Sequence, residues 1–373
     1  MLSVIPPPKI SCSVVRFLCR SLSSQGGVGH SGHLSADLLR NAHDVPVANA
    51  DAISAVSHKS KYLFDLNGYV ILRKVFTNDD VKAANDAIDK HIKDGFLHER
   101  KGKLRTSGLY GRESSALAGD GETGRFDMGG MLGWERPFCE PFRSVLCHPA
   151  IAPFLNEVLG AGYRLDHSPL LIAQEKGSEG HTLHGGAVTE SGDPAWPLAY
   201  DFKHGTMRSQ LLTVCMQLTA ANEGDGGFCA VPGSHKSNYS VPPDLADLAD
   251  EELAEHVRQP VLLPGDVLIF SEATLHGTLP WRASHQRRTV IYRFAPAGSA
   301  YGRGYLATSD QESMWPGSAL EGMTDSQRAV MLPPYHPRMN RPYVDSAGNA
   351  VGAKPRESFK VEFDEKVFGT KYF

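Results

Sequence analysis

The chain of 373 residues is long enough to bury one large core, and its 41% hydrophobic and 21% charged residues are ordinary for a globular protein. A formal net charge of −4 argues against a general nucleic-acid binder, and no apolar run of about 18 residues is present that would span a membrane. The six cysteines form no CxxC pair, which argues against a zinc knuckle and favours a reducing compartment.

Residues 1–36 differ in composition from the rest of the chain. They contain no Asp or Glu, many serines, and the basic residues Lys9, Arg16 and Arg20. This composition predicts a transit peptide that directs the protein to mitochondria, with a plastid or the cytoplasm as the alternative. Residues 37–58 are predicted to be a polar linker.

The first regular elements are a strand and a helix. Residues 68–76, within "YLFDLNGYVILRKVF", are typical of a strand. "TNDDVKAANDAIDKHIKDGF" then predicts a helix, because Thr77 or Asn78 offers an N-cap and apolar residues from Val81 to Ile92 recur on one face.

A glycine-rich, charged segment follows at residues 97–125. It is predicted to be a loop, either a lid whose Lys103, Arg105 and Arg112 meet an anionic substrate or a solvated basic surface. "PFRSVLCHPAIAPFLNEVLG" then predicts a second helix that ends at Gly160.

Short strands dominate the sequence from there on. They are "YRLDHSPLLIAQ", "RSQLLTVCMQLTA", "GGFCAVPGS", "PVLLPGDVLIFSEATLHGT" and "RRTVIYRFAPA", and one acidic stretch, "DLADLADEELAEHVRQ", is typical of a surface helix. This order predicts a mainly β fold with flanking helices, an antiparallel barrel or double-sheet jelly roll over residues 59–300. Residues 301–373 are expected to pack on the barrel as an extension.

A candidate metal centre involves "HTLHGGAVTE" and a later strand. Positions two apart on a strand point to the same face, so His184 and residue 186 are expected to face one lumen. A His-X-Asp pair there, with a distant histidine such as His276, would form the facial triad of non-haem Fe(II) oxygenases. In this chain, however, residue 186 is glycine.

An anion site is predicted on the last of these strands. Arg287 opens "RRTVIYRF", and an arginine buried in a barrel needs an anionic partner. Its planar guanidinium suits the distal carboxylate of 2-oxoglutarate, and Thr289 would face the same way. Arg288 would point to the opposite face.

The sequence resembles the phytanoyl-CoA dioxygenase family of Fe(II)- and 2-oxoglutarate-dependent oxygenases. The resemblance covers about residues 62–296 and is carried by "FDLNGYVILRKVFTNDDV", "LDHSPLLIAQ", "NEGDGGFCAVPGSHKSNYSVP" and "PGDVLIFSEATLHGTLPW" followed by "RRTVIYRF". It implies a double-stranded β-helix, a jelly-roll, cupin-like barrel.

The resemblance also implies roles for single residues. His184 and His276 match the two iron histidines, Arg287 matches the 2-oxoglutarate arginine, and Thr278 lies where a hydroxyl can approach 2-oxoglutarate. His235, in "PGSHK", matches a turn of the family and is interpreted as structural.

Gly186 departs from the family pattern, which has Asp or Glu there. Four explanations remain open: chloride takes the ligand position, as in related halogenases; another carboxylate fills it; water fills it; or the protein is non-catalytic. Glu190, Asp193 and Asp201 are the nearby carboxylates. His181 is expected to face the other way on a regular strand.

These patterns lead to a prediction of Fe(II)- and 2-oxoglutarate-dependent hydroxylation of an aliphatic C–H in a small-molecule or acyl substrate. Halogenation with bound chloride is the alternative, and a non-catalytic binding relative is the third possibility.

Overall fold

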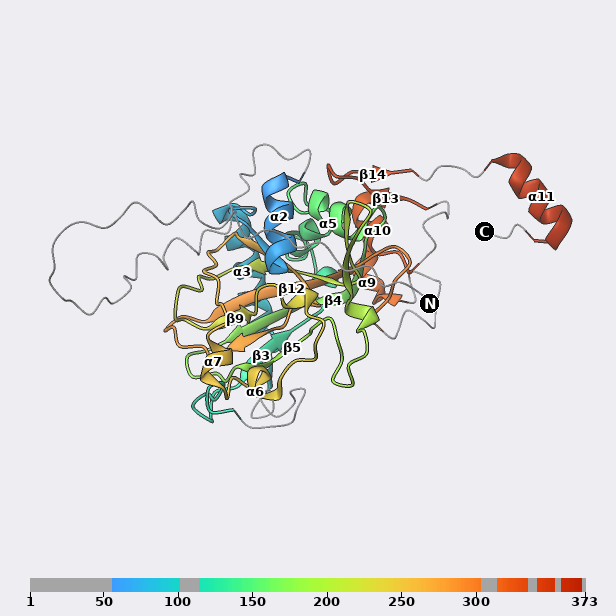
Figure 1. Cartoon of the computed structure of the whole chain (residues 1–373). Coiled ribbons are helices and arrows are strands. Elements are labelled where there is room, and N and C mark those ends of the chain that lie inside the picture. Colours follow the sequence, from blue (N-terminus) through green and yellow to red (C-terminus); the bar gives the residue numbers. More distant parts are fainter. Residues whose placement is uncertain (1–55, 101–113, 303–313, 335–340, 353–356, 371–373) are drawn as a thin grey trace, which may run out of the picture. The chain divides into compact units, whose positions relative to one another are not determined.

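The computed structural model describes residues 56–100, 114–302, 314–334, 341–352 and 357–370. Two antiparallel sheets form its centre, with helices around them (Figure 1). The predicted transit peptide at residues 1–36 lies outside the described residues, as do the lid candidates Lys103, Arg105 and Arg112.

The larger sheet has seven strands, each paired antiparallel with its neighbours. Its spatial order is β1 (Tyr69–Leu72), β10 (Val267–Ser271), β8 (Leu212–Gln217), β12 (Arg287–Ala295), β4 (Arg164–Gln174), β3 (Arg125–Met128) and β2 (His98–Arg100). The smaller sheet consists of β5 (His181–His184), β11 (His276–Leu279) and β9 (Gly227–Ala230). The jelly-roll prediction is confirmed, although the described strands form two sheets and not one closed barrel.

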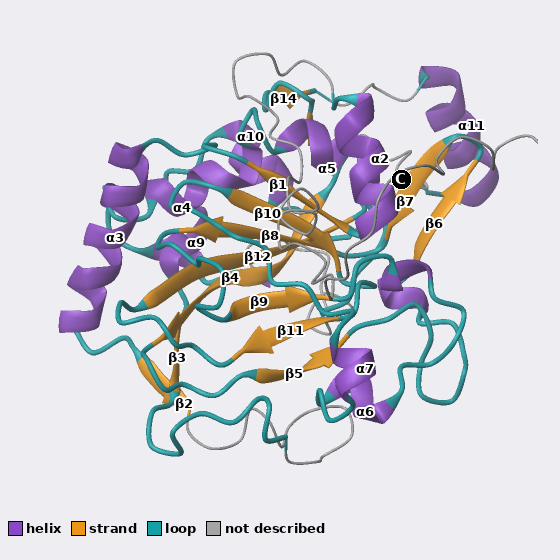
Figure 2. Cartoon of the chain, turned by 60° about the vertical axis from the view of Figure 1, so that its left-hand side comes forward, coloured by secondary structure: helices purple, strands orange, loops and turns teal. Residues whose placement is uncertain are grey.

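The two faces of the larger sheet have different environments, because side chains on a strand alternate in direction. On β12, Val290 and Tyr292 belong to a hydrophobic core shared with helix residues, whereas Arg287 and Thr289 line a cavity. The helices on the core side are α2 (His58–Asn67), α3 (Asn78–Lys93), α4 (Glu140–Ser144) and α5 (Ala152–Leu159). Figure 2 shows these helices on one side of the large sheet and β5, β11 and β9 on the other.

The first predicted helix forms as α3. The Thr77 side chain accepts a hydrogen bond from the Asp80 backbone N–H, and the Asp80 side chain accepts one from the Thr77 backbone N–H, so that a capping box fixes the start of the helix. Val81, Ala84 and Ile88 are buried on its inner face, as the apolar spacing predicts.

The second predicted helix is interrupted. α4 passes into the 3₁₀ turn η3 (Val145–Cys147), and α5 begins only at Ala152. His148 leaves the helical region with ψ 130°, because Pro149 disfavours helical backbone in the residue before it. The acidic stretch is likewise divided into α6 (Pro243–Ala246) and α7 (Glu251–Ala254).

The remaining elements include several that belong to the C-terminal extension. They are η2 (Met131–Gly133), η4 (Trp196–Leu198), β6 (Tyr200–Lys203), β7 (Thr206–Ser209), η5 (Ser234–Lys236), α9 (Gly317–Leu320), α10 (Asp325–Val330), β13 (Tyr343–Val344), β14 (Ala350–Val351) and α11 (Ser358–Phe368). The hydrophobic core on the large sheet includes Trp315, Leu320, Val330 and Val344 from this extension.

None of the helices among the described residues has the length and apolar character needed to cross a bilayer.

Candidate metal centre between the two sheets

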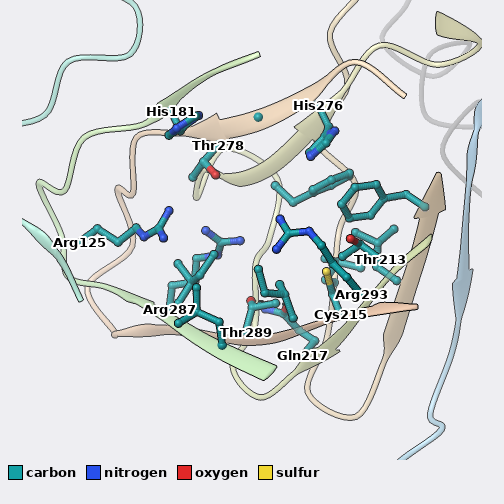
Figure 3. Close-up of a pocket in the computed structure, with 18 of the residues that line it drawn as sticks. Arg125, His181, Thr213, Cys215, Gln217, His276, Thr278, Arg287, Thr289 and Arg293 are labelled. Atoms are coloured by element: carbon teal, nitrogen blue, oxygen red, sulfur yellow. Dashed lines mark hydrogen bonds between the residues drawn. The ribbon is translucent and has the colours of Figure 1, made fainter. Parts of the chain in front are cut away.

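A cavity of about 300 Å³ lies between the two sheets, and the five site residues predicted from the sequence all line it. They are His184, His276, Thr278, Arg287 and Thr289. Figure 3 shows Arg287 and Arg293 pointing into this space from the large sheet, with His276 on the facing wall. The volume lies at the lower end of the range for small-molecule sites.

His184 and His276 lie side by side on paired strands. The two residues are direct partners in the β5–β11 register, and their ring centroids are 4.3 Å apart. Nδ1 of His184 lies 3.0 Å from the Thr182 carbonyl oxygen, and Nδ1 of His276 lies 2.7 Å from that of Thr274. A carbonyl oxygen only accepts, so each Nδ1 carries the proton and, in the neutral ring, each Nε2 presents a lone pair to a metal ion.

Burial keeps both rings neutral near pH 7. It lowers the pKa of His184 to about 4, with the neighbouring His276 adding to the effect, and it also lowers the pKa of His276. Neutral imidazole is the form that binds a metal, so no proton has to be removed from the pair at neutral pH.

A bulge brings His181 into the same cavity. His184 pairs with His276 and His181 pairs with Thr278, so three steps along β5 face two steps along β11. The extra residue reverses the alternation of side chains. His181 therefore lines the cavity with its ring centroid 4.9 Å from that of His184, and the expectation that it faces away was wrong because it assumed a regular strand.

Gly185 and Gly186 follow the end of β5 with φ of 99° and 100°, in a region that favours glycine. Residue 186 therefore does not continue the alternation from which a His-X-Asp pair was expected. A Cβ on residue 186 would lie 3.3 Å from Cγ2 of Val241 and 3.7 Å from the Val188 carbonyl oxygen.

The carboxylates suggested by the sequence lie elsewhere. Glu190 lines a second cavity, Asp193 accepts a hydrogen bond from Ser191 in an exposed turn, and Asp201 is exposed on β6. No contact joins any of the three to His184 or His276 in the part of the chain that the structure describes.

The carboxylate beside the histidines is Glu272, which the sequence analysis missed. It lies in the turn between β10 and β11, is 6% exposed, and places Oε2 3.8 Å from Nε2 of His276. Its Oε1 accepts hydrogen bonds from Nε of Arg293 at 2.8 Å and from the Thr213 hydroxyl. The only sequence signal was a glutamate four residues before the distal histidine.

The charge of Glu272 is stabilised by its neighbours. Burial alone raises the pKa of this carboxyl, but Arg293, His276 and the hydrogen bond from Thr213 together lower the pKa to about 2. Across the described residues, no three His, Cys, Asp or Glu side chains already converge as a complete set of metal ligands. The two histidines are therefore the fixed part of the candidate centre.

Arg287 is a buried cation without a carboxylate partner among the described residues. It is 5% exposed, Nη1 donates to Oε1 of Gln174 at 2.6 Å, and Gly227 lies against the guanidinium. Burial lowers the pKa of Arg287 to about 10, so the group remains charged at neutral pH. A buried charge of this kind requires an anion, and the cavity is where an anion would bind.

The neighbours of Arg287 follow the alternation of β12. Thr289 faces the same cavity, where its hydroxyl donates to Oε1 of Gln217 at 2.8 Å. Arg288 faces the helix layer and bonds to Asn85 and Asp89 of α3, at 3.0 and 2.6 Å.

Two further arginines give this end of the cavity a positive charge. Arg125 binds Asp127 through Nε at 2.7 Å and Nη2 at 3.0 Å, and Arg100 binds the same carboxylate at 3.0 Å. Both arginines line the cavity. One carboxylate thus serves two cations, and Arg287 adds a third positive charge nearby.

A second, more open cavity of about 800 Å³ shares His184 with the first. Its other lining residues include Gly186, Val241, Glu272 and Tyr301. His184 therefore lines both cavities.

His235 lies apart from both cavities. It is fully buried, its Nε2 lies 3.0 Å from the Asp65 carbonyl oxygen, and its ring packs on Tyr200 at 4.6 Å. These contacts are structural.

Comparison with known proteins places these features in a family. A family model described as phytanoyl-CoA dioxygenase matches residues 64–289. Curated protein sequences gave no significant match to the chain.

Solved structures with a similar fold include HygX from Streptomyces hygroscopicus. HygX with nickel and 2-oxoglutarate bound has a TM-score of 0.51 and 17% sequence identity, and the match covers 65% of this chain and 88% of HygX. HygX that also contains hygromycin B gives the same values. Iron-bound HygX gives a TM-score of 0.50, 17% identity, and coverage of 65% and 87%. At this identity the likeness concerns the fold.

Substitution of the two glycines is expected to destabilise the protein in a defined order. Gly185→Ala should cost most, because its Cβ would lie 2.6 Å from the Thr274 carbonyl oxygen and 2.7 Å from that of Glu272. Gly186→Ala and Gly186→Asp should each cost about 1–2 kcal/mol from backbone strain. Gly317→Ala, with ordinary φ and open space, is the control. Urea unfolding measures the order, and a fully stable Gly185→Ala would contradict it.

The metal-free protein is expected to lose stability as the pH falls from 6.5 towards 4. The pKa of both His184 and His235 is about 4 in the folded state, below the ordinary value of 6.5, so the unfolded chain takes up protons first. Each ring contributes a slope of at most about 1.4 kcal/mol per pH unit in this window. Urea unfolding at pH 7 and pH 5 tests this, and His184→Asn should show the shallower dependence. Equal stability at both pH values would refute it.

Proposed function

The chain belongs to the phytanoyl-CoA dioxygenase family, as its sequence resemblance predicted, and from this premise we propose that it is an Fe(II)- and 2-oxoglutarate-dependent hydroxylase. The observation that carries the proposal is that two metal-competent histidines share one cavity with a buried arginine that has no carboxylate partner among the described residues. Its substrate is a small molecule or an acyl compound with an aliphatic C–H.

The residues of the cavity fit both cofactors. Nε2 of His184 and Nε2 of His276 would hold Fe(II), because their Nδ1 atoms are already committed to carbonyl oxygens. Arg287 would bind the distal carboxylate of 2-oxoglutarate, which supplies the anion that this buried cation needs. Thr278 and Thr289 flank the same space with hydroxyl groups.

When bound, Fe(II) and 2-oxoglutarate supply the oxidising power that converts C–H into C–OH, with O₂ consumed and succinate and CO₂ formed. The protein orients the reactants and limits water. Phe228, Leu268 and Phe270 make the wall beside His276 apolar. The more open cavity that shares His184 would receive the substrate, since 2-oxoglutarate would occupy the cavity between the sheets.

Gly186 supports halogenation as the second candidate, because this chain lacks the carboxylate that the family has at this position and chloride would complete the ligand set. Hydroxylation remains the first candidate, because Glu272 offers a carboxylate beside His276 that would bind the metal in place of chloride.

Succinate formation tests the enzymatic proposal. Full-length protein supplied with Fe(II), 2-oxoglutarate and O₂ should form succinate, slowly without substrate, and His276→Ala should abolish it because one of two fixed ligands is lost. A wild-type protein that forms no succinate under any of these conditions would favour a binding relative. With a turned-over substrate, a product that gains chlorine in chloride buffer and no oxygen would favour the halogenase.

Arg287 and Arg288 offer a matched pair for the 2-oxoglutarate site. Arg287→Gln should raise the 2-oxoglutarate concentration for half-maximal turnover at least about 10-fold, because hydrogen bonds to a charged group are lost. Arg288→Gln removes the same charge from the opposite face and should change this concentration little. The measurement is succinate formation against 2-oxoglutarate concentration, and equal effects of the two substitutions would contradict the assignment.

A further inference from the structure

We propose that Glu272 is the third protein ligand of the metal, reaching it from the turn between β10 and β11 in place of the absent carboxylate at residue 186. This inference rests on the proposed Fe(II) site and specifies its ligand set. Glu272 would supply the carboxylate ligand that the family has at the position of Gly186.

The two oxygens of Glu272 have different roles in the structure. Oε1 accepts both hydrogen bonds, from Nε of Arg293 and from the Thr213 hydroxyl. The contact recorded for Oε2 is with Nε2 of His276, at 3.8 Å. One oxygen therefore anchors the side chain, and the other is directed at the histidine nitrogen that would bind the metal.

Oε2 of Glu272 and Nε2 of His276 are both hydrogen-bond acceptors, and no hydrogen lies between them. Nδ1 of His276 donates to the Thr274 carbonyl oxygen, so Nε2 of the neutral ring carries no hydrogen. A lone pair on nitrogen then faces a carboxylate oxygen in a buried site, an arrangement that a shared cation stabilises. Adjacent ligands of one octahedral ion at about 2.1 Å lie roughly 3 Å apart, so Oε2 would have to approach Nε2 of His276 by less than about 1 Å to share the ion.

The glycines and Glu272 form one local structure. The backbone N–H of Gly186 donates to the Ala273 carbonyl oxygen at 2.9 Å. A Cβ on Gly185 would lie 2.7 Å from the Glu272 carbonyl oxygen. The two glycines thus lie directly against the turn that carries Glu272, and a side chain at residue 185 would displace that turn.

Glu272 and its hydrogen-bond partners together contact both cavities. With His184, Glu272 lines the more open cavity, while its partners Thr213 and Arg293 line the cavity between the sheets. Glu272 thus shares one cavity with His184 and lies 3.8 Å from Nε2 of His276. Its ligation would fill the position that a halogenase leaves for chloride, and so favours hydroxylation.

Metal titration of full-length protein tests the ligand without relying on turnover. Metal-free wild type and Glu272→Gln are titrated with Co(II) under anaerobic conditions, without 2-oxoglutarate, and followed by the visible absorption of the bound ion. Glu272→Gln should bind Co(II) at least about 10-fold more weakly, since even loss of an outer-shell partner costs 10- to 100-fold. The band should also change in shape, because one oxygen donor is lost.

Two matched variants control for charge and folding. Asp266→Asn makes the same chemical change in a buried carboxylate that pairs with Arg73 at 2.7 Å, at the start of β10, and should bind Co(II) like wild type. Glu272→Asp keeps the charge beside Arg293 but shortens the side chain, and should also weaken binding. It keeps the test decisive should Glu272→Gln fail to fold.

The titrations distinguish a failure of the Glu272 assignment from a failure of the proposed metal site. Equal Co(II) affinity and spectra for wild type and folded Glu272 variants would overturn the ligand assignment and leave Glu272 as the counter-ion of Arg293. A large loss in His181→Asn, with none in Glu272→Gln, would also overturn it, in favour of a third histidine. A wild-type protein that binds no Co(II) or Fe(II) would instead refute the proposed metal site as a whole.

Discussion

His184 and His276 meet because β5 and β11 pair antiparallel with these two residues in register. A shift of one residue in either strand would turn one ring out of the cavity, since side chains alternate along a strand. The backbone carbonyls of Thr182 and Thr274 then fix the orientation of the rings through Nδ1. Strand pairing therefore sets the distance between the imidazoles, and backbone hydrogen bonds set the nitrogen that each presents. The rest of the site is arranged around this pair.

The wall of the cavity that faces the histidines carries four arginines, and their charges are balanced to different extents. Arg293 and Glu272 balance each other, and Arg125 and Arg100 share Asp127. Among the described residues, Arg287 bonds to the neutral amide of Gln174 and to no carboxylate. A fully hydrogen-bonded ion pair keeps its charges at modest cost, but a single buried cation does not. The unbalanced charge of Arg287 is therefore the feature that favours binding of an anionic ligand. Arg287 lies on β12, the same strand as Arg293, the counter-ion of Glu272.

Sequence alone predicted the parts of this structure that follow from strand periodicity. Arg287 and Thr289 face the cavity and Arg288 faces α3, because β12 is regular at this point. The errors occur where the backbone is irregular. The bulge in β5 turned His181 inward, and the positive φ of Gly186 removed that residue from the strand alternation. Glu272 was missed because a turn, which has no periodicity, brings it to the histidines. Pro149 divided the second helix for a local reason that the apolar pattern did not include.

His184 lines both cavities, and the two cavities are built from different kinds of structure. The cavity between the sheets is built mainly from paired strands, so its shape is set by the register of both sheets. The open cavity is built from the loop after β5 together with Tyr301. Tyr301 is itself held by its backbone N–H, which donates to the buried carboxylate of Asp166 at 3.1 Å. Loops change in sequence and length at less cost to stability than paired strands. Under the proposed function, the strands therefore determine how 2-oxoglutarate binds, and the loop after β5 determines which C–H is presented to the metal.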